Sequence, residues 1–408
     1  MDKLRNITFS PPDITEEEIN EVVDALRSGW ITTGPKTKEF ERKIADYVGV
    51  HKAVCLNSAT AAMELSLHIL GIGPGDEVIT SAYTYSASAS VIHHVGAKII
   101  LVDTAPNSYE IDYDQLEAAI NEKTKAIIPV DIAGVICDYD RIYEAVENKK
   151  YLFKARNTKQ NSIGRVTVIA DAAHSFGATR NNKISGLLAD ITCFSFHAVK
   201  NLTTAEGGAV VWQHSFGMTD DEFYKEYMLY SLHGQSKDAF SKMQKGAWEY
   251  DIVYPGYKNN MTDILAALGL VQLKRYNQLL KRRFEIIELY EKYLDSNKVQ
   301  IIKHYGENYR SSGHLLLCNL IGLSLEQRNK VIIELAEVGI STNVHYKPLP
   351  MFTAYRNLGF SIKDYPNAYR TYSNEITLPL HTLLSNEDIE YLTTKLNEII
   401  NSKEFYFV

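Results

Sequence analysis

Short apolar runs rich in β-branched residues alternate with amphipathic stretches through the first 295 residues of the chain. Uninterrupted apolar runs are typical of parallel strands that are buried on both faces, and the stretches between them supply the crossover helices. The last two runs leave no room for a helix between them, so the sheet is expected to be mixed. The pattern predicts an α/β fold with strands at residues 53–56, 77–79, 98–102, 125–130, 165–170, 191–196 and 208–212.

The amphipathic stretches predict the helices, and the lengths of the predicted elements change after residue 294. A capping box at residues 15–18 opens a helix that ends at Gly29. A long helical segment is predicted at residues 261–294, and a new set of shorter elements follows it. We therefore expect a large domain at residues 1–294 and a smaller α/β domain at residues 295–408. The other predicted elements are helices at 38–48, 61–70, 88–95, 325–338 and 387–400, and strands at 299–303, 314–320 and 341–345.

The composition excludes several classes of protein. Apolar residues make up 45% and charged residues 23% of the 408 residues, which is ordinary for a soluble globular chain. The formal net charge of −7 argues against nucleic acid or an anionic membrane as a partner. The four cysteines lie far apart, and no apolar run reaches the roughly 18 residues of a membrane span. With no apolar leader segment at its start, the chain is expected to be a cytoplasmic enzyme.

Several stretches of the sequence resemble nucleotide- or metal-binding motifs but lack the residues or the spacing that these motifs require. Pro35 interrupts the glycine pattern that begins at Gly29, and residues 71–75 lack the spacing of a dinucleotide site. His93 and His94 are adjacent, which is the wrong spacing for two metal ligands on one helix face, so no metal site is predicted. The connection at residues 149–165 carries six Lys or Arg and no acid. We interpret it as a solvated loop, with a phosphate-contacting flap as the alternative.

Two strand ends carry residues suited to binding a phosphorylated ligand. Residues 57–62 follow a strand and open a helix, so free N–H groups and the hydroxyls of Ser58 and Thr60 can hold a phosphate. Such residues also cap helices that bind nothing. Asp171 ends the strand at 166–170, at the edge where open α/β sheets bind ligands. The alternative role for Asp171 is a helix N-cap.

A lysine in the next strand connection gives these strand ends a specific chemistry. Lys200 lies 29 residues after Asp171 and precedes a Gly-rich turn. A lysine removed from water has a lowered pKa and forms a Schiff base with an aldehyde. A carboxylate against the nitrogen of a pyridine ring would keep that ring an electron sink. The three patterns together predict a site for pyridoxal 5'-phosphate (PLP), although a lone lysine is usually a surface residue.

The segments around these residues resemble the sugar-nucleotide aminotransferases of the DegT/DnrJ/EryC1/StrS family, a branch of the fold-type I PLP enzymes. The resemblance implies a large domain with a seven-stranded, mixed and mostly parallel sheet, plus a smaller C-terminal α/β domain. The matching segments follow the family's order over nearly the whole chain: Ser28–Pro35, Asn57–Ala61, Asp171–His174, Ser195–Glu206, Gly256–Asp263 and Val344–Tyr346.

The resemblance also implies roles for single residues. Lys200 corresponds to the lysine that carries the cofactor and acts as base, and Asp171 to the partner of the pyridine nitrogen. Tyr85 corresponds to the aromatic residue that stacks on the cofactor ring, with a core aromatic as the alternative. His174 corresponds to a residue beside the ring. The residues expected at the phosphate are Ser58, Ala59, Thr60, Ser195 and Asn260.

The implied reaction is a ping-pong transfer of an amino group from glutamate to a nucleotide-linked 4-keto sugar, for polysaccharide or related amino-sugar biosynthesis. The implied assembly is a homodimer in which Asn260 reaches the phosphate of the neighbouring subunit; the alternative is that Asn260 caps the following helix. Two other functions stay open. In a PLP-dependent sugar dehydratase a histidine replaces the lysine, so Lys200 counts against it, and the intact acid–lysine pair counts against a silent PLP-binding regulator. Asn259 stands where an aromatic residue is common, which leaves the sugar undetermined.

Overall fold

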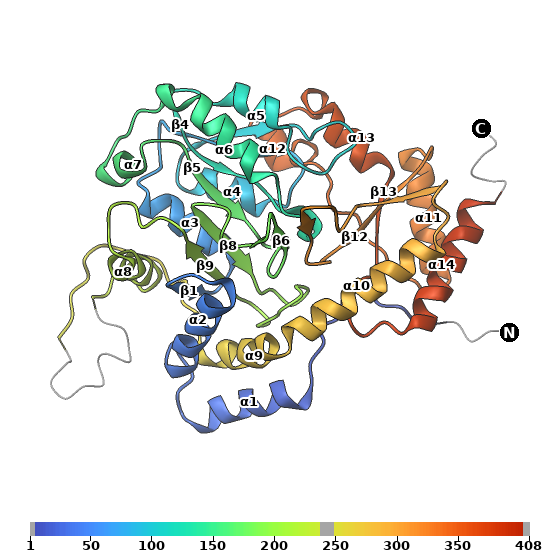
Figure 1. Ribbon diagram of the computed structural model, residues 1–408, viewed down its shortest axis with the longest axis horizontal. Helices are drawn as coiled ribbons and strands as arrows, with labels where there is room; N and C mark the ends of the chain where they lie inside the picture. Colours follow the sequence, from blue (N-terminus) through green and yellow to red (C-terminus); the bar gives the residue numbers. More distant parts are fainter. Residues whose placement is uncertain (1–4, 237–248, 403–408) are drawn as a thin grey trace.

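The computed structural model describes residues 5–236 and 249–402 (Figure 1). Its largest element is a seven-stranded sheet in the order β1-β9-β8-β5-β4-β2-β3. β9 is antiparallel to both of its neighbours, and all other neighbouring strands are parallel. The predicted mixed, mostly parallel sheet is confirmed. Its strands are β1 (Ala53–Leu56), β2 (Glu77–Ser81), β3 (Lys98–Val102), β4 (Thr124–Ile128), β5 (Thr167–Asp171), β8 (Ile191–Ser195) and β9 (Gly208–Trp212).

Helices cover both faces of this sheet (Figure 1). The middle positions of these strands are mostly apolar because alternate side chains pack on opposite faces. In β5, Val168 and Ala170 belong to one buried cluster and Ile169 to the other. The helices up to the end of the sheet are α1 (Glu16–Arg27), α2 (Pro35–Val48), α3 (Ala59–Ile69), α4 (Ala87–His94), α5 (Tyr113–Ala119), α6 (Tyr139–Asn148), α7 (Thr158–Ile163) and α8 (Asp220–Ser231), with short 3-10 turns η1 (Ile132–Gly134) and η2 (Lys150–Leu152).

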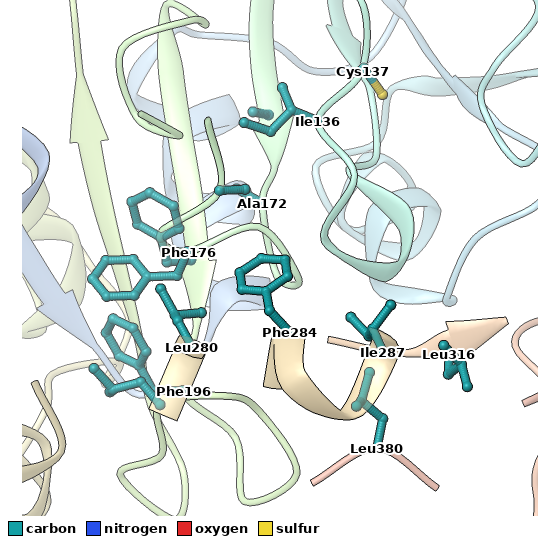
Figure 2. Packing of buried hydrophobic residues seen from close by; sticks show 14 of the residues in the cluster. Ile136, Cys137, Ala172, Phe176, Phe196, Leu280, Phe284, Ile287, Leu316 and Leu380 are labelled. Carbon is teal, nitrogen blue, oxygen red and sulfur yellow. The ribbon is translucent and has the colours of Figure 1, made fainter. Parts of the chain in front are cut away.

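The long helical segment predicted at residues 261–294 is two helices, α9 (Asp263–Lys274) and α10 (Tyr276–Tyr293). The break falls at Arg275, whose backbone leaves the helical region at φ −104° and ψ 7°. Its guanidinium bonds Glu18 of α1 at 2.6 Å, a tertiary contact that the local pattern does not record. α10 then runs from the large sheet to a second one, with Leu280 beside Phe176 and Ile287 beside Leu380 (Figure 2).

The second sheet has three antiparallel strands in the order β10 (Val299–Ile301), β12 (Leu316–Leu320) and β13 (Glu375–Leu378). The strand predicted at residues 341–345 is wrong: this stretch makes only single bridges, and β13 takes the place beside β12. The helices here are α11 (Leu325–Glu337), α12 (Thr353–Asn357), α13 (Pro366–Asn374) and α14 (Asn386–Ile400), with 3-10 turns η4 (Leu349–Met351) and η5 (Ile362–Asp364).

A third, small sheet joins the hairpin β6 (Thr179–Arg180) and β7 (Lys183–Ile184) to β11 (Tyr309–Arg310). One buried hydrophobic cluster contains residues of both larger sheets, and the division into domains at 1–294 and 295–408 stays a prediction. None of the described helices is long and apolar enough to cross a membrane. Residues 1–4 lie outside the described residues. They belong to the N-terminal segment that is expected from the sequence to contain no leader.

The basic connection at residues 149–165 is largely neutralised by acids from elsewhere in the chain. Arg165 makes a bidentate pair with the buried Asp190, with both N–O distances at 2.8 Å. Four further cations are paired: Lys150 with Glu147, Lys154 with Glu122, Arg156 with Asp76 and Lys159 with Glu226. These pairs favour a structural connection over a flap that contacts phosphate.

Candidate active site

The carboxyl ends of β1, β2, β4, β5 and β8 meet at one edge of the seven-stranded sheet, because these strands run in the same direction. A cavity of about 470 Å³ opens at this edge. Eight of the nine residues predicted for the site line it: Ser58, Ala59, Thr60, Tyr85, Asp171, His174, Ser195 and Lys200. Segments far apart in the sequence are thus brought to one place, where a sheet of this class binds its ligand.

Lys200 lies in the connection from β8 to β9, where its N–H donates to His197 O at 2.8 Å. Burial lowers the pKa of Lys200 to about 8, and the negative charge of Asp171 acts against this shift. Part of the lysine population is therefore an unprotonated amine near neutral pH, which is the form that acts as nucleophile and base.

Asp171 is the last residue of β5 and is 5% exposed. Its oxygens accept from Ser88 Oγ at 2.6 Å and from the Ala173 N–H at 3.2 Å. Burial raises the pKa of Asp171, while the hydrogen bonds from Ser88 and Ala173 and the charge of Lys200 oppose the rise. Because Ser88 gives its single proton to Asp171, the 2.9 Å contact between Thr84 and Ser88 must be donated by Thr84.

His174 lies three residues after the end of β5 and is buried. Its Nδ1 lies 3.2 Å from the N–H of Ala133, and its Nε2 lies 3.2 Å from the hydroxyl of Tyr346. Burial, together with the charges of Lys200 and His345, holds the pKa of His174 well below its ordinary value. The ring is therefore neutral at neutral pH and forms a fixed wall of the cavity.

The start of α3 forms the part of the cavity suited to a phosphate. Ser58 is the helix N-cap and accepts from the Ala61 N–H at 3.0 Å. Among the described residues, no acceptor is bonded to the N–H groups of Ala59 and Thr60, so both remain free for an anion. β9 passes very close by: a Cβ on Gly208 would come within 2.4 Å of the Ser58 backbone, so only glycine fits there.

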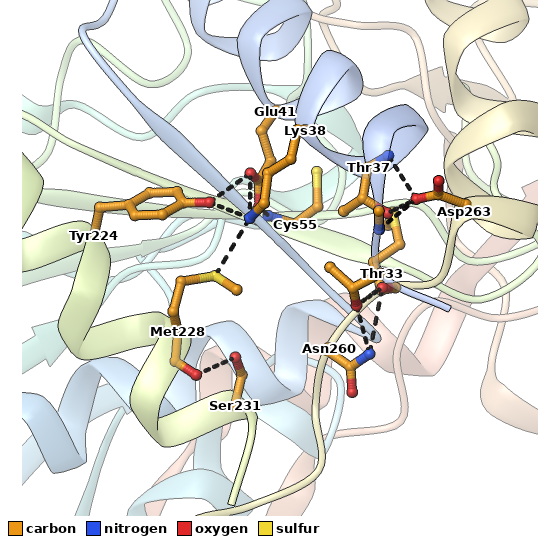
Figure 3. Close-up of polar contacts among 12 residues, drawn as sticks. Thr33, Thr37, Lys38, Glu41, Cys55, Tyr224, Met228, Ser231, Asn260 and Asp263 are labelled. Carbon is orange, nitrogen blue, oxygen red and sulfur yellow. Dashed lines mark hydrogen bonds and ion pairs between the residues drawn. The ribbon is translucent and has the colours of Figure 1, made fainter. Parts of the chain in front are cut away.

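Asn260 is the one predicted residue that does not line the cavity. Its amide donates to Thr33 at 2.6 Å (Figure 3). Its amide oxygen accepts from the Lys258 amine at 2.5 Å. It does not cap the helix that follows, because the N-cap of α9 is Thr262. The structure therefore removes the helix-cap alternative and leaves the predicted contact with a neighbouring subunit as a proposal.

Sequence reasoning missed several residues of the site. His345 and Tyr346 line the cavity from the chain that precedes η4, and Ser88 lies behind Asp171 in the first turn of α4. The segment containing His345 and Tyr346 was matched to the family pattern, but neither residue was assigned a role in the site. Ser88 could not have been found, because a serine in a helix has no local feature that connects it to an acid 83 residues away.

The fold and the cavity define an α/β enzyme with a buried acid, a lysine of lowered pKa and a helix N-terminus around one site. The chain matches the DegT/DnrJ/EryC1/StrS aminotransferase family over residues 12–397, and it belongs to that family. It is 37% identical over 405 residues to the spore coat polysaccharide biosynthesis protein SpsC of Bacillus subtilis, with 98% of each chain covered.

Two further similarities are to proteins named as sugar aminotransferases. The chain is 35% identical over 404 residues to UDP-4-amino-4-deoxy-L-arabinose–oxoglutarate aminotransferase of Shewanella sediminis, covering 96% of this chain and 97% of that protein. Among solved structures it is similar to Streptococcus pneumoniae Spr1654, named as a sugar aminotransferase, in its PLP form: the TM-score is 0.94 at 54% identity, covering 97% of this chain and 99% of that one. A PMP form of the same protein has the same TM-score.

The chain is thus a sugar aminotransferase of a PLP-dependent family, and the predicted cofactor is confirmed. The residues of the cavity fit this group. An acid suited to a pyridine nitrogen, an amine of lowered pKa suited to an aldehyde, and the free N–H groups of a helix N-terminus suited to a phosphate lie around one space.

Proposed function

We propose that the protein transfers the amino group of glutamate to a nucleotide-linked 4-keto sugar, in the cytoplasm, as a homodimer with shared active sites. The observation that carries the proposal is the meeting of Asp171 and Lys200 in one cavity, with the pKa of the lysine lowered to about 8. The curated relatives support a sugar as acceptor, since one is named for spore coat polysaccharide and one for an amino sugar.

Each residue of the cavity would have a separate role in the reaction, set by its position. PLP, when bound, supplies an electron sink for the negative charge that develops at the carbon next to the amino nitrogen. Asp171 would hold a proton on the pyridine nitrogen, and its hydrogen bond from Ser88 keeps its charge in a buried place. Lys200 Nζ would take the proton from one carbon and return it to another, because it is tethered beside both. The N–H groups of Ala59 and Thr60 would hold the phosphate.

The choice of substrates is tested by a screen. The purified protein loaded with PLP is incubated with glutamate and a set of nucleotide 4-keto sugars, and mass spectrometry detects the aminated sugar and 2-oxoglutarate. We expect one or a few sugars to be aminated, since pockets that hydrogen-bond a substrate discriminate strongly. Glutamine in place of glutamate is the control for the donor. A protein that aminates none of the sugars contradicts the proposed acceptor.

The role of Lys200 is tested by chemical trapping. Borohydride reduction of the loaded protein fixes the cofactor to the lysine that holds it, and peptide mapping should place the added mass on Lys200. Lys347, which directly follows the cavity-lining Tyr346 in the sequence, is the internal control and should stay unmodified. Cofactor mass on any other lysine contradicts the assignment.

The surroundings of Asn260 support a shared site. Ile31, Ile252, Val253 and Tyr257, in the same region of the chain as Asn260 or its partner Thr33, are 52%, 48%, 59% and 38% exposed. Exposed apolar side chains of this size gathered near one loop favour a contact with a second copy of the chain. Asn260 itself does not line the cavity of its own chain, which is compatible with donation to a neighbour.

Mixed dimers test the shared site. Lys200→Ala removes the lysine of its own site. Asn260→Ala would instead weaken the binding of the cofactor phosphate in the neighbouring subunit's site. In a mixed dimer both changes fall on one site and leave the other intact, so co-refolding should restore up to about half of the wild-type activity per mixed dimer. Each variant refolded alone is the control. Mixtures that never exceed the average of the two, with subunit exchange verified, place Asn260 in its own site.

A further inference from the structure

A chain of three groups beside the cavity, from the Ala133 N–H through the His174 ring to the Tyr346 hydroxyl, determines where one proton points. We propose that the hydroxyl of Tyr346 donates a hydrogen bond to the carbonyl oxygen of the keto substrate, in a direction fixed by His174 and Ala133. The inference rests on the proposed function, since it concerns the acceptor of the amino group.

The chain of groups starts at a backbone amide. Ala133 lies in η1 with φ at +57°, a left-handed conformation that alanine seldom adopts, and it is fully buried. In this conformation its N–H lies 3.2 Å from Nδ1 of His174. A backbone N–H can only donate, so Nδ1 of His174 must accept and cannot carry a proton.

The neutral ring of His174 therefore carries its one proton on Nε2. Burial, and then the charges of Lys200 and His345, keep the pKa of this ring well below its ordinary value, so the doubly protonated form is not populated at neutral pH. Nε2 lies 3.2 Å from the hydroxyl oxygen of Tyr346. His174 is consequently the donor in this contact, and Tyr346 is the acceptor.

The proton of the Tyr346 hydroxyl must then point elsewhere. Burial raises the pKa of Tyr346, so the hydroxyl keeps its proton at neutral pH. Within the part of the chain that the structure describes, His174 is the one hydrogen-bond partner of this hydroxyl. The ring lines the cavity that also contains Lys200, and it stacks against His174 with 19° between the planes. The Tyr346 O–H is thus available to donate a hydrogen bond to an oxygen of a ligand in the cavity.

The segment that carries Tyr346 is itself held in place. The backbone N–H of His345 donates to the buried carboxyl of Glu375 at 3.0 Å, and the His345 ring contacts Thr377 at 2.9 Å. The hydroxyl of Thr377 also lies 2.6 Å from the carboxyl of Glu375. Both partners belong to β13, and they connect Tyr346 to the rigid second sheet.

A donor fixed in this way suits the carbonyl oxygen of the acceptor. When an amine nitrogen bonds to the carbonyl carbon, the π electrons of the C=O bond move onto oxygen and make it negative. A hydrogen-bond donor that already points at this oxygen stabilises the charge without reorganising, and loss of one such donor typically costs 10²- to 10³-fold in rate. We assign this part to Tyr346.

The experiment compares holoenzymes of wild type and Tyr346→Phe in a single turnover. Each protein is converted to its PMP form, mixed with the keto sugar that wild type accepts, and followed by absorbance; 2-oxoglutarate replaces the sugar if none is accepted. We expect a loss of about 10²-fold in the rate, with cofactor affinity and the unfolding temperature unchanged. A rate close to wild type, or a loss explained by weaker cofactor binding, overturns the proposal.

Variants of His174 test whether it acts through Tyr346. His174→Gln offers an oxygen to the Ala133 N–H and an N–H to Tyr346, whereas His174→Met offers neither. The glutamine variant should be faster than the methionine variant in the wild-type background, and the two should differ little when Tyr346 is phenylalanine. An equal difference in both backgrounds means that His174 acts independently of Tyr346 and overturns the arrangement.

The position of the proton is measurable without any substrate. In holoenzyme labelled with ¹⁵N-histidine, nitrogen shifts distinguish a protonated from an unprotonated ring nitrogen, and His174→Gln identifies the signals of His174. We expect a protonated Nε2 and an unprotonated Nδ1. A proton on Nδ1 overturns the inference even if the sugar is aminated, whereas failure of amination with this tautomer intact contradicts the proposed function alone.

Discussion

Asp171 and Asp263 are two buried aspartates, 5% and 2% exposed, whose oxygens are satisfied to very different extents. Asp263 begins α9 and accepts four hydrogen bonds at 2.7–3.0 Å, all from the start of α2: the N–H groups of Gly34, Lys36 and Thr37 and the hydroxyl of Thr37 (Figure 3). Three of these bonds reach Oδ1 and one reaches Oδ2, so at most about one of the four acceptor positions of the carboxylate remains.

Asp171 accepts only two hydrogen bonds, from Ser88 and Ala173, and it lines the cavity. Half of its acceptor capacity is therefore left for a ligand. Asp263 instead fixes α9 to the N-terminus of α2, where the helix dipole also favours a negative charge. The comparison teaches that burial alone does not identify a reactive acid. A buried carboxylate that accepts several hydrogen bonds from its own chain and lies outside the cavity stabilises the fold, and one with more spare capacity at a cavity is available for chemistry.

The largest expected effect concerns Asp171. Asp171→Asn keeps the shape but removes the charge, and turnover should fall by roughly 10²-fold or more, as for loss of a preorganised electrostatic contact. The free energy of unfolding should change by less than about 1 kcal/mol, because few hydrogen bonds depend on this charge. Steady-state kinetics and urea unfolding of the loaded variant measure the two. Near-normal turnover would make Asp171 a structural residue like Asp263.

For Asp263 we expect the opposite result, a loss of stability with little change in turnover. Asp263→Asn removes the charge and one acceptor from a set of four hydrogen bonds, and it should lower the free energy of unfolding by about 2 kcal/mol. Turnover per folded molecule, measured well below the unfolding transition, should stay close to wild type. Asp171→Asn is the matched control, since the same chemical change is made at the other buried acid. A stable but inactive Asp263→Asn variant would contradict the distinction between the two aspartates.

The smallest effect tests how Asp171 keeps its charge. Ser88→Ala removes one donor, so the pKa of Asp171, already raised by burial, should rise further. The ionised form is the active one and is lost as pH falls through this pKa. The acidic limb of the pH–rate profile should therefore move to higher pH, with turnover near neutral pH reduced about tenfold. Ser88→Thr keeps a hydroxyl and should restore the profile. An unmoved acidic limb in Ser88→Ala would show that the serine only packs.

Local pattern was enough for the elements that are buried on both faces. The strands between Ala53 and Trp212 are largely apolar, and a largely apolar strand must be covered by another layer wherever it lies. The same reasoning found Asp171 and Lys200, because the end of an internal strand opens on the ligand-binding edge of such a sheet. The sequence by itself therefore determined the fold class, and it predicted two residues, Asp171 and Lys200, that the structure places in one cavity.

The tertiary structure alone decided what depends on distant partners. Arg275, where the long helix breaks, pairs with the distant Glu18, and β13 takes the place beside β12 that was predicted for residues 341–345. Ser88 meets Asp171, and Tyr346 meets His174 across 172 residues of sequence. Hydrogen bonds act over about 3 Å, and folding sets which groups come that close. Composition and periodicity carry no record of such distances, so the positioning residues of the site became visible only in the folded chain.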